Sequence, residues 1–198
     1  MHILIVFSHP NRESLNGAFL DKAIEGLKLN PEKVEVEVLD LYSDYFDPRL
    51  TFNEEKKRRD MYRDPAMEKY RQQILNADRI IFIYPIWWGR PPAILLGYFD
   101  QLLSSGFAYK NIPGKIMPEG LLKKKRVVCI STMKGPTGYP LLLLRNAHKV
   151  LMRKAIFNFV GIRDVRFFEF GGMEKKNGKQ AEYLKRIKRY MLKLKSVA

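Results

Sequence analysis

Residues 80–109 read IIFIYPIWWGRPPAILLGYFDQLLSSGFAY, and this stretch decides the fold class. It begins with a continuous apolar run, which is typical of a strand that is buried on both faces of a sheet. Pro91 and Pro92 then predict the start of a helix that continues to about Ser105, because proline is tolerated in a first helical turn. A buried strand followed by a loop and a helix is the repeating unit of a parallel α/β sheet.

The same alternation continues on both sides of this unit. Apolar runs predict strands at residues 3–7, 34–41, 79–84, 127–131 and 165–170. Further helices are predicted at residues 14–29, 54–76 with a break near Asp64-Pro65, 140–158 and 180–194, whereas 43–53 and 110–120 are predicted loops. We therefore expect one α/β domain over residues 1–198, a doubly wound five-stranded parallel sheet in the order 2-1-3-4-5.

The composition is that of a globular protein. Hydrophobic residues make up 46% of the 198 residues and charged residues 29%. No apolar run approaches the roughly 18 residues that a membrane helix needs, and the N-terminus, MHILIVFSHP, lacks the basic segment of a signal peptide. Cys129 is the only cysteine, so no intrachain disulfide forms and a cytoplasmic location is expected.

The net charge of +15 is unevenly distributed along the chain. Residues 1–109 carry 14 basic and 16 acidic side chains, whereas residues 110–198 carry 22 and 5. The simplest interpretation is a set of solvated helix faces, as in the C-terminal helix. A membrane surface or an acidic partner remains an alternative, and charge alone is too little to indicate nucleic-acid binding, which we do not expect.

In parallel sheets, ligands bind beyond the carboxyl ends of the strands, which directs attention to three loops. The first is residues 8–16, SHPNRESLN, which contains neither a P-loop nor a GxGxxG motif. It leads into a helix N-terminus, where backbone N–H groups and the helix dipole favour a phosphate. Ser14, Asn16 and His9 offer further hydrogen-bond donors; alternatively, Ser14 is a plain helix cap and His9 a surface residue.

The second loop, residues 84–92, contains both tryptophans, Trp87 and Trp88. Flat aromatic walls and a rigid backbone suit a planar conjugated ligand. The alternative is that the two tryptophans cap the core.

The third loop, residues 131–139, contains Gly135 and Gly138, which allow a backbone to approach a ligand closely. Lys134, Tyr139 and Arg145 are its candidate polar groups, and a surface turn is the alternative. A zinc site is not expected, because the three histidines are far apart in the sequence and there is one cysteine. No GxSxG motif supports a hydrolase.

Taken together, these segments resemble the flavodoxin-like NAD(P)H:quinone oxidoreductases, the group of DT-diaphorase and the bacterial modulator of drug activity B proteins. The resemblance runs through the chain and is carried by residues 8–16, by DLYSDYFDPRL at 40–50, by residues 80–109 and by the loop 131–139. It implies a flavodoxin-like fold and a flavin-containing homodimer with each active site at the subunit interface.

The resemblance also implies the roles of individual residues. Those expected to bind the flavin phosphates are His9, Ser14, Leu15 and Asn16. Those expected to line the flavin ring are Pro85, Ile86, Trp87, Trp88, Thr132, Gly135 and Tyr139. Trp88 and Tyr109 are expected to face the substrate. The spacing of Ser14 and Asn16 and the loop at Phe46-Asp47-Pro48 resemble the FAD-containing members, so FAD is expected ahead of FMN.

The activity implied is two-electron, ping-pong hydride transfer from NAD(P)H through the flavin to quinones, or to azo or nitro aromatics. Tyr139, Lys134 and Arg145 are the candidates for stabilising the charge of the reduced flavin. The chain departs from the family pattern at Met133-Lys134, where DT-diaphorase has two glycines, at Arg145, where the family has a histidine partner of the tyrosine, and at Asn111, where it has an aromatic residue.

Two other functional classes are weighed against this enzyme. A one-electron carrier of the flavodoxin type is usually acidic, which the charge of +15 argues against. The stronger alternative is a flavin-containing ancillary subunit that regulates a potassium-efflux-type membrane partner, docked through the basic half of the chain.

Overall fold

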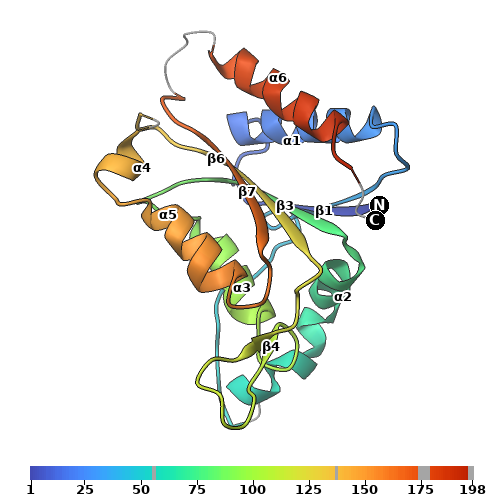
Figure 1. Cartoon of the computed structure of the whole chain (residues 1–198), viewed down its shortest axis with the longest axis vertical. Coiled ribbons are helices and arrows are strands. Elements are labelled where there is room, and N and C mark those ends of the chain that lie inside the picture. The colour runs from blue at the N-terminus through green and yellow to red at the C-terminus, as the bar shows by residue number, and fades with distance from the viewer. Residues whose placement is uncertain (55–56, 137, 174–178, 196–198) are drawn as a thin grey trace.

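A computed structural model describes residues 1–54, 57–136, 138–173 and 179–195. Its centre is a sheet of five parallel strands in the order β2-β1-β3-β6-β7 (Figure 1). The strands are β1 (His2–Phe7), β2 (Glu35–Asp40), β3 (Arg79–Pro85), β6 (Arg126–Thr132) and β7 (Asp164–Phe170). The predicted fold class and the strand order 2-1-3-4-5 are therefore confirmed.

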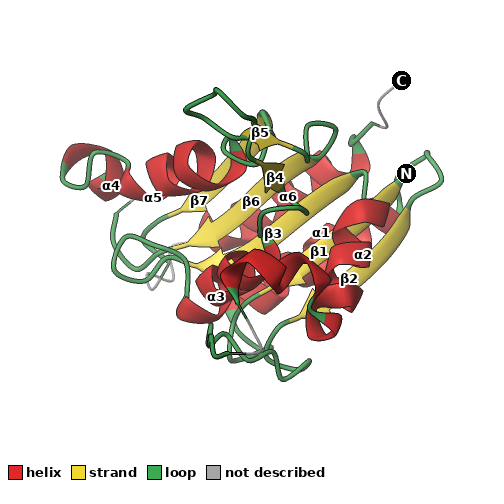
Figure 2. Ribbon diagram, turned by 90° about the horizontal axis from the view of Figure 1, so that it is seen from below, coloured by secondary structure: helices red, strands yellow, loops and turns green. Residues whose placement is uncertain are grey.

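Helices cover both faces of this sheet. Helices α1 (Leu15–Lys28) and α6 (Lys179–Leu192) lie on one face, and α2 (Glu68–Asn76) and α3 (Ala93–Leu102) lie on the other (Figures 1 and 2). Ile3 and Ile5 pack with the first pair of helices, whereas Leu4 and Val6 pack with the second pair. Strand β1 thus buries both faces, which explains its unbroken apolar run.

The N-terminal helix and the region before β3 follow the local signals closely. Ser14 caps α1 by accepting a hydrogen bond from the backbone N–H of Gly17. The predicted break at Asp64-Pro65 separates two short 3₁₀ segments, η1 (Arg58–Arg63) and η2 (Pro65–Met67), and the α-helical part begins only at Glu68. Asp64 accepts from the N–H of Ala66, which satisfies the start of the second segment.

The prediction of a continuous helix over residues 140–158 is wrong. The chain forms two short helices, α4 (Tyr139–Leu142) and α5 (Ala147–Lys149), and then a π-helix, η3 (Val150–Phe157). Arg145 and Asn146 adopt left-handed backbone conformations with φ of 47° and 57°, which end the first helical turn. The N–H of Asn146 donates to the carbonyl of Pro140 at 2.7 Å and closes the break.

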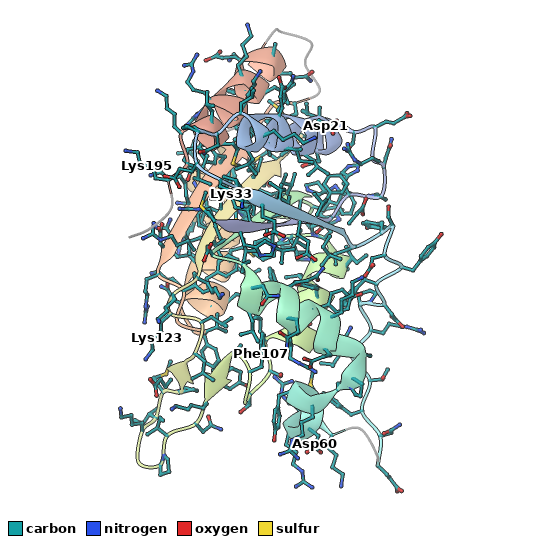
Figure 3. The ribbon with its side chains drawn as sticks, turned by 90° about the vertical axis from the view of Figure 1, so that its right-hand side faces the viewer. Asp21, Lys33, Asp60, Phe107, Lys123 and Lys195 are labelled. Carbon is teal, nitrogen blue, oxygen red and sulfur yellow. The ribbon has the colours of Figure 1, made fainter. Side chains whose placement is uncertain are left out.

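The remaining segments are short or polar. The predicted loop 110–120 is closed by a small antiparallel pair, β4 (Tyr109–Lys110) with β5 (Glu119–Gly120). Lys33, Lys123 and Lys195 extend from the surface, in line with the solvated interpretation of the basic charge (Figure 3). None of the helices in the described part of the chain has the length and apolar run of a membrane-spanning segment.

Candidate active site

The loop after β3 turns sharply and presents a tryptophan to the outside. Trp87 and Arg90 exchange two backbone hydrogen bonds, of 3.0 and 3.1 Å, around Trp88 and Gly89. Both central residues have positive φ, 52° and 72°, as a two-residue turn of this kind requires. Trp88 is 95% exposed and Trp87 42%, so the interpretation that this pair caps the core is wrong. A large side chain held outward in a strained turn is typical of a contact surface.

The loop after β1 is shaped by its own side chains. His9 Nδ1 accepts from the N–H of Asn11 at 3.0 Å, and Asn11 Oδ1 accepts from the N–H of Glu13 at 2.8 Å. These turns are followed directly by Ser14, the N-cap residue of α1. The N–H groups of Leu15 and the residues after it point out of the helix start, where an anion is favoured.

Buried polar contacts connect this loop to the end of β6. Asn16 Nδ2 donates to Thr132 Oγ1 at 2.9 Å, and both side chains are buried. Asn16 Oδ1 is also buried, and within the described residues it has no hydrogen-bond partner. An unsatisfied buried amide oxygen costs about 1–3 kcal/mol, so the arrangement favours a ligand that donates a hydrogen bond there.

Backbone hydrogen bonds join the second loop to the third, and the third loop to the segment after β7. The N–H of Ile86 donates to the carbonyl of Thr132 at 2.8 Å, and the N–H of Gly172 donates to the carbonyl of Gly135 at 2.7 Å. The rings of His9 and Trp87 lie 6.2 Å apart. The sequence-predicted segments therefore meet at one edge of the sheet.

A cavity of about 620 Å³ opens between the second and third loops. This volume falls within the roughly 300–1,000 Å³ of small-molecule sites. Its wall is mainly apolar and consists of Ile86, Trp88, Gly89, Met133, Lys134, Gly135, Pro136, Tyr139, Pro140, Leu144 and His148. The ring-binding and charge-stabilising candidates Ile86, Trp88, Gly135, Tyr139 and Lys134 are thus brought together.

Other candidates lie elsewhere. His9 and Ser14 are on the adjoining loop, Leu15 and Asn16 begin α1, and Pro85, Trp87 and Thr132 do not line the cavity. Thr137, within the third loop, lies outside the described residues. Arg145 is exposed and does not line the cavity, because the left-handed break carries it away.

Tyr109 is not part of this cavity either. It packs edge-on against Phe159, with the ring centroids 4.9 Å apart, and lines a separate groove. Its predicted role toward the substrate therefore depends on a second subunit.

His148 was missed by the sequence analysis. It lines the cavity, its side chain is only 1% exposed, and it lies between two buried partners. Its Nδ1 is 2.6 Å from Glu169 Oε1, and its Nε2 is 2.8 Å from the Tyr84 hydroxyl. One signal was available, namely a glutamate in the apolar run VRFFEF at residues 165–170, which needs a buried partner.

Hydrogen bonding sets the protonation states around this histidine. Burial raises the pKa of Glu169, but hydrogen bonds from His148 and Lys149 outweigh burial and leave the pKa below its ordinary value. Glu169 is therefore ionised at neutral pH. Burial raises the pKa of Tyr84 well above its ordinary value, so this hydroxyl keeps its proton.

The arrangement fits a flavin, the group that the resemblance implies. The start of α1 suits its phosphate, the unsatisfied Asn16 Oδ1 needs a donor, and the mainly apolar cavity suits a planar ring. Among the described residues, no cluster of three or more metal-ligating side chains occurs.

Comparison with known proteins decides the family. A family described as having a flavodoxin-like fold matches residues 1–194. The chain belongs to it. An uncharacterized NAD(P)H oxidoreductase of Haemophilus influenzae is 34% identical over 172 residues, which cover 86% of this chain and 84% of that protein. The resemblance to flavodoxin-like NAD(P)H:quinone oxidoreductases is thereby confirmed.

Two further members of this family carry more specific names. The ribosyldihydronicotinamide dehydrogenase [quinone] of Mus musculus is 32% identical over 67% of this chain and 63% of its own length. The solved structure of an NAD(P)H:quinone oxidoreductase from Methanothermobacter marburgensis is 25% identical. It superposes with a TM-score of 0.85 and covers 98% of this chain and 99% of that one.

Proposed function

We propose that this chain is a flavin-dependent NAD(P)H:quinone oxidoreductase. The observation that carries the proposal is the meeting of three loops at the carboxyl edge of the sheet, around a mainly apolar cavity of about 620 Å³. Relatives named as NAD(P)H oxidoreductases and as quinone-reducing enzymes support this reaction class.

Different loops bind different parts of the flavin. Ser14, Leu15, Asn16 and His9 bind its phosphate at the start of α1, where the N–H groups have no acceptor within the helix. The segment from Pro85 to Trp88 and the segment from Thr132 through Gly135 to Tyr139 would line its ring. When bound, the flavin supplies an acceptor and donor of hydride.

Polar groups of the third loop stabilise the charge that reduction creates. Tyr139 lines the cavity and offers a hydroxyl donor, and Lys134 offers a positive charge from the same wall. Inside an apolar cavity such groups act more strongly than in water. Arg145 was a third candidate, but its position outside the wall leaves Tyr139 and Lys134 to carry this role.

The shape of the cavity favours flat aromatic acceptors. Trp88 and Ile86 form an apolar wall that can stack against a planar ring. Such contacts do not distinguish the substituents of the ring. One open cavity serves NAD(P)H and the acceptor in turn, which gives a ping-pong cycle. Quinones are the proposed acceptors, with azo and nitro aromatics as further substrates.

Anaerobic spectroscopy tests this function directly. We expect protein loaded with one flavin per chain to lose its visible absorbance on addition of NADPH or NADH, and to regain it on addition of menadione. Steady-state rates should give parallel double-reciprocal lines. The proposal would be overturned if the flavin of loaded protein stayed oxidised with both NADPH and NADH.

The preferred flavin is proposed to be FAD. The loop after β1 and the segment at Phe46-Asp47-Pro48 motivate this choice over FMN. Release of the flavin by heat, followed by chromatography beside both standards, distinguishes the two.

The active unit is proposed to be a homodimer. A second groove, of about 310 Å³, lies between η1, α3 and η3 and is lined by Arg58, Leu96, Phe99, Asp100, Leu103, Tyr109, Leu151, Ala155, Ile156, Phe159 and Val160. A second copy would cover this groove and bring Tyr109 and the exposed Trp88 toward a shared site. Light scattering should give twice the chain mass of 23.2 kDa at micromolar concentration, and a monomer mass would refute the dimer.

The regulatory alternative is not carried forward. None of the three relatives described above is named as a subunit of a membrane protein.

A further inference from the structure

A connected series of buried polar groups lies beneath the cavity. It runs from Glu169 through His148 to Tyr84, with the half-exposed Lys149 at one end and Cys129 in the core cluster at the other. These groups come from α5 and from three neighbouring strands, β7, β3 and β6. Burying so many polar groups destabilises a fold unless each one is satisfied, so their arrangement is informative.

Glu169 determines which nitrogen of His148 carries the proton. One carboxylate oxygen accepts from His148 Nδ1 at 2.6 Å, and the other pairs with Lys149 Nζ at 2.5 Å. An ionised carboxylate only accepts, so Nδ1 is the protonated nitrogen. Nε2 is left facing the Tyr84 hydroxyl at 2.8 Å. The imidazole is thereby fixed in orientation and in tautomer.

Tyr84 and Cys129 satisfy His148 in both of its protonation states. While Nε2 is neutral, the Tyr84 hydroxyl donates to it. Once Nε2 is protonated it donates to the hydroxyl oxygen, and the hydroxyl proton turns toward the sulfur of Cys129, which lies in the same core cluster as Tyr84. Burial raises the pKa of Cys129 to about 12, so its sulfur stays a thiol and a weak acceptor. His148 Nε2 therefore has a partner in both states.

Two charged groups lie close to the imidazole. Glu169 from β7 contacts Nδ1, and Lys149 of the histidine's own helix pairs with the other oxygen of the same carboxylate. Tyr84 and Cys129 contribute neutral groups from β3 and β6.

The cavity side of the imidazole has its own groups, Tyr139 and Lys134. With opposing charges so close, a new charge in the cavity tips the balance at His148, because electrostatic effects are strong in a poorly solvated interior.

We propose that His148 is a proton-binding positioning residue of this cavity, held by Glu169 through Nδ1 and satisfied by Tyr84 and Cys129 in either state, which gains a proton when negative charge develops beside it. This proposal rests on the proposed function, in which reduction of the bound flavin supplies that charge. The proton comes from solvent, forms one N–H bond at Nε2 and returns to solvent when the charge leaves. No other bond is made or broken at the histidine.

Nitrogen NMR of the histidine side chains measures this directly. The chain has three histidines, His2, His9 and His148, and a His148→Gln variant identifies the signals of His148 by their loss. We expect the Nδ1–H tautomer in the neutral state. In flavin-loaded protein we expect the proton affinity of His148 to rise at least about tenfold when the flavin is reduced by dithionite.

A matched pair of variants tests the network without relying on flavin. Tyr84 and Tyr98 are both fully buried, but only Tyr84 contacts the histidine. Tyr84→Phe removes the acceptor for the protonated Nε2, so the proton affinity of His148 should fall about tenfold in flavin-free protein. Tyr98→Phe should leave it unchanged.

The outcomes separate the two proposals. Equal proton affinity of His148 in oxidised and reduced loaded protein would overturn the redox link while leaving the proposed function intact. Protein that retains no flavin in its visible spectrum would overturn the proposed function and the redox link with it. An Nε2–H tautomer, or equal effects of the two tyrosine variants, would overturn the network itself.

Discussion

The loops that follow β1 and β6 reach the same edge of the sheet and enter their helices in opposite ways. After β1, the chain turns at Ser14 and continues as a regular helix of 14 residues. After β6, the chain forms only a four-residue helix, passes through two left-handed residues and resumes as a π-helix. Both stretches begin after a buried strand, so the strand is not the source of the difference.

The difference comes from what each stretch must bury. Helix α1 presents one apolar stripe to the sheet, including Phe19 and Ala23, and a regular helix does this well. The stretch after β6 must line the cavity with Tyr139 and His148 and also fill the core with Phe157. A single straight helix cannot direct all of these side chains correctly, so tertiary packing overrides helix propensity.

The largest effect is expected from a single methyl group in the first turn of α1, where the first of these loops ends. A Cβ added at Gly17 would lie 1.8 Å from the carbonyl oxygen of Arg12, whereas one added at Gly138 would lie 3.7 Å from Leu142 Cδ1. Gly17→Ala should lower the free energy of unfolding by at least about 2 kcal/mol, although alanine is the better helix former by about 1 kcal/mol. Gly138→Ala should stay within about 0.5 kcal/mol. Urea unfolding measures both, and equal stabilities would contradict the idea that the start of α1 is more tightly packed than the loop after β6.

A charge at the helix cap should separate ligand binding from folding. Ser14→Asp keeps a good capping residue but places a carboxylate beside the proposed phosphate. Flavin affinity should fall about tenfold to a hundredfold, while the unfolding midpoint changes little. Ser14→Asn is the matched control, because it caps equally well without charge. Equal flavin affinity in the two variants, measured by fluorescence titration, would rule out a phosphate at this helix start.

The corresponding test in the loop after β6 is Tyr139→Phe. A hydrogen bond to a charged group contributes about 1.5–3 kcal/mol, which corresponds to a roughly ten- to hundredfold slower reduction of the flavin. The flavin itself should stay bound. Tyr190, whose ring packs against Phe168, provides the control. In Tyr190→Phe the bound flavin should be reduced at the parental rate. Stopped-flow reduction by NADPH at the parental rate would show that Tyr139 only packs.

The smallest expected effect concerns the break itself. Arg145 has a φ of 47°, which suits glycine better than arginine. Arg145→Gly should raise the free energy of unfolding by up to about 1 kcal/mol. Lys154→Gly, at an exposed position within η3, should lower it by about 0.5–1 kcal/mol. If Arg145→Gly destabilises the protein as much as Lys154→Gly does, the break is not maintained by the left-handed backbone.

Local signals were sufficient for most of the architecture. The apolar runs at residues 3–7 and 79–84 predicted strands buried on both faces, and Ser14 predicted the start of α1 correctly. The same reasoning placed the three loops at one edge, because carboxyl ends of parallel strands meet there. Cys129, inside the predicted strand at residues 127–131, is fully buried.

The long-range pairings needed the tertiary structure. In sequence, His148 lies 64 residues from Tyr84 and 21 from Glu169, and no local pattern links the three. The left-handed pair Arg145-Asn146 is only weakly marked, since asparagine tolerates this conformation but arginine does not, and the apolar spacing around them is helical. Periodicity shows which side chains are apolar. It does not show that the segment after β6 must line a cavity and also fill part of the core.

The sequence by itself determined the strands, the capped helix α1 and the family resemblance, because each depends on residues that are neighbours along the chain or on patterns of fixed period. The strand order followed from the fold class that these features indicate. Only the tertiary structure decided that Arg145 leaves the cavity, that Trp88 points outward, and that His148 enters a buried network. These outcomes depend on packing between segments far apart in sequence, where the free energy of burying or satisfying one polar group outweighs the preferences of its neighbours.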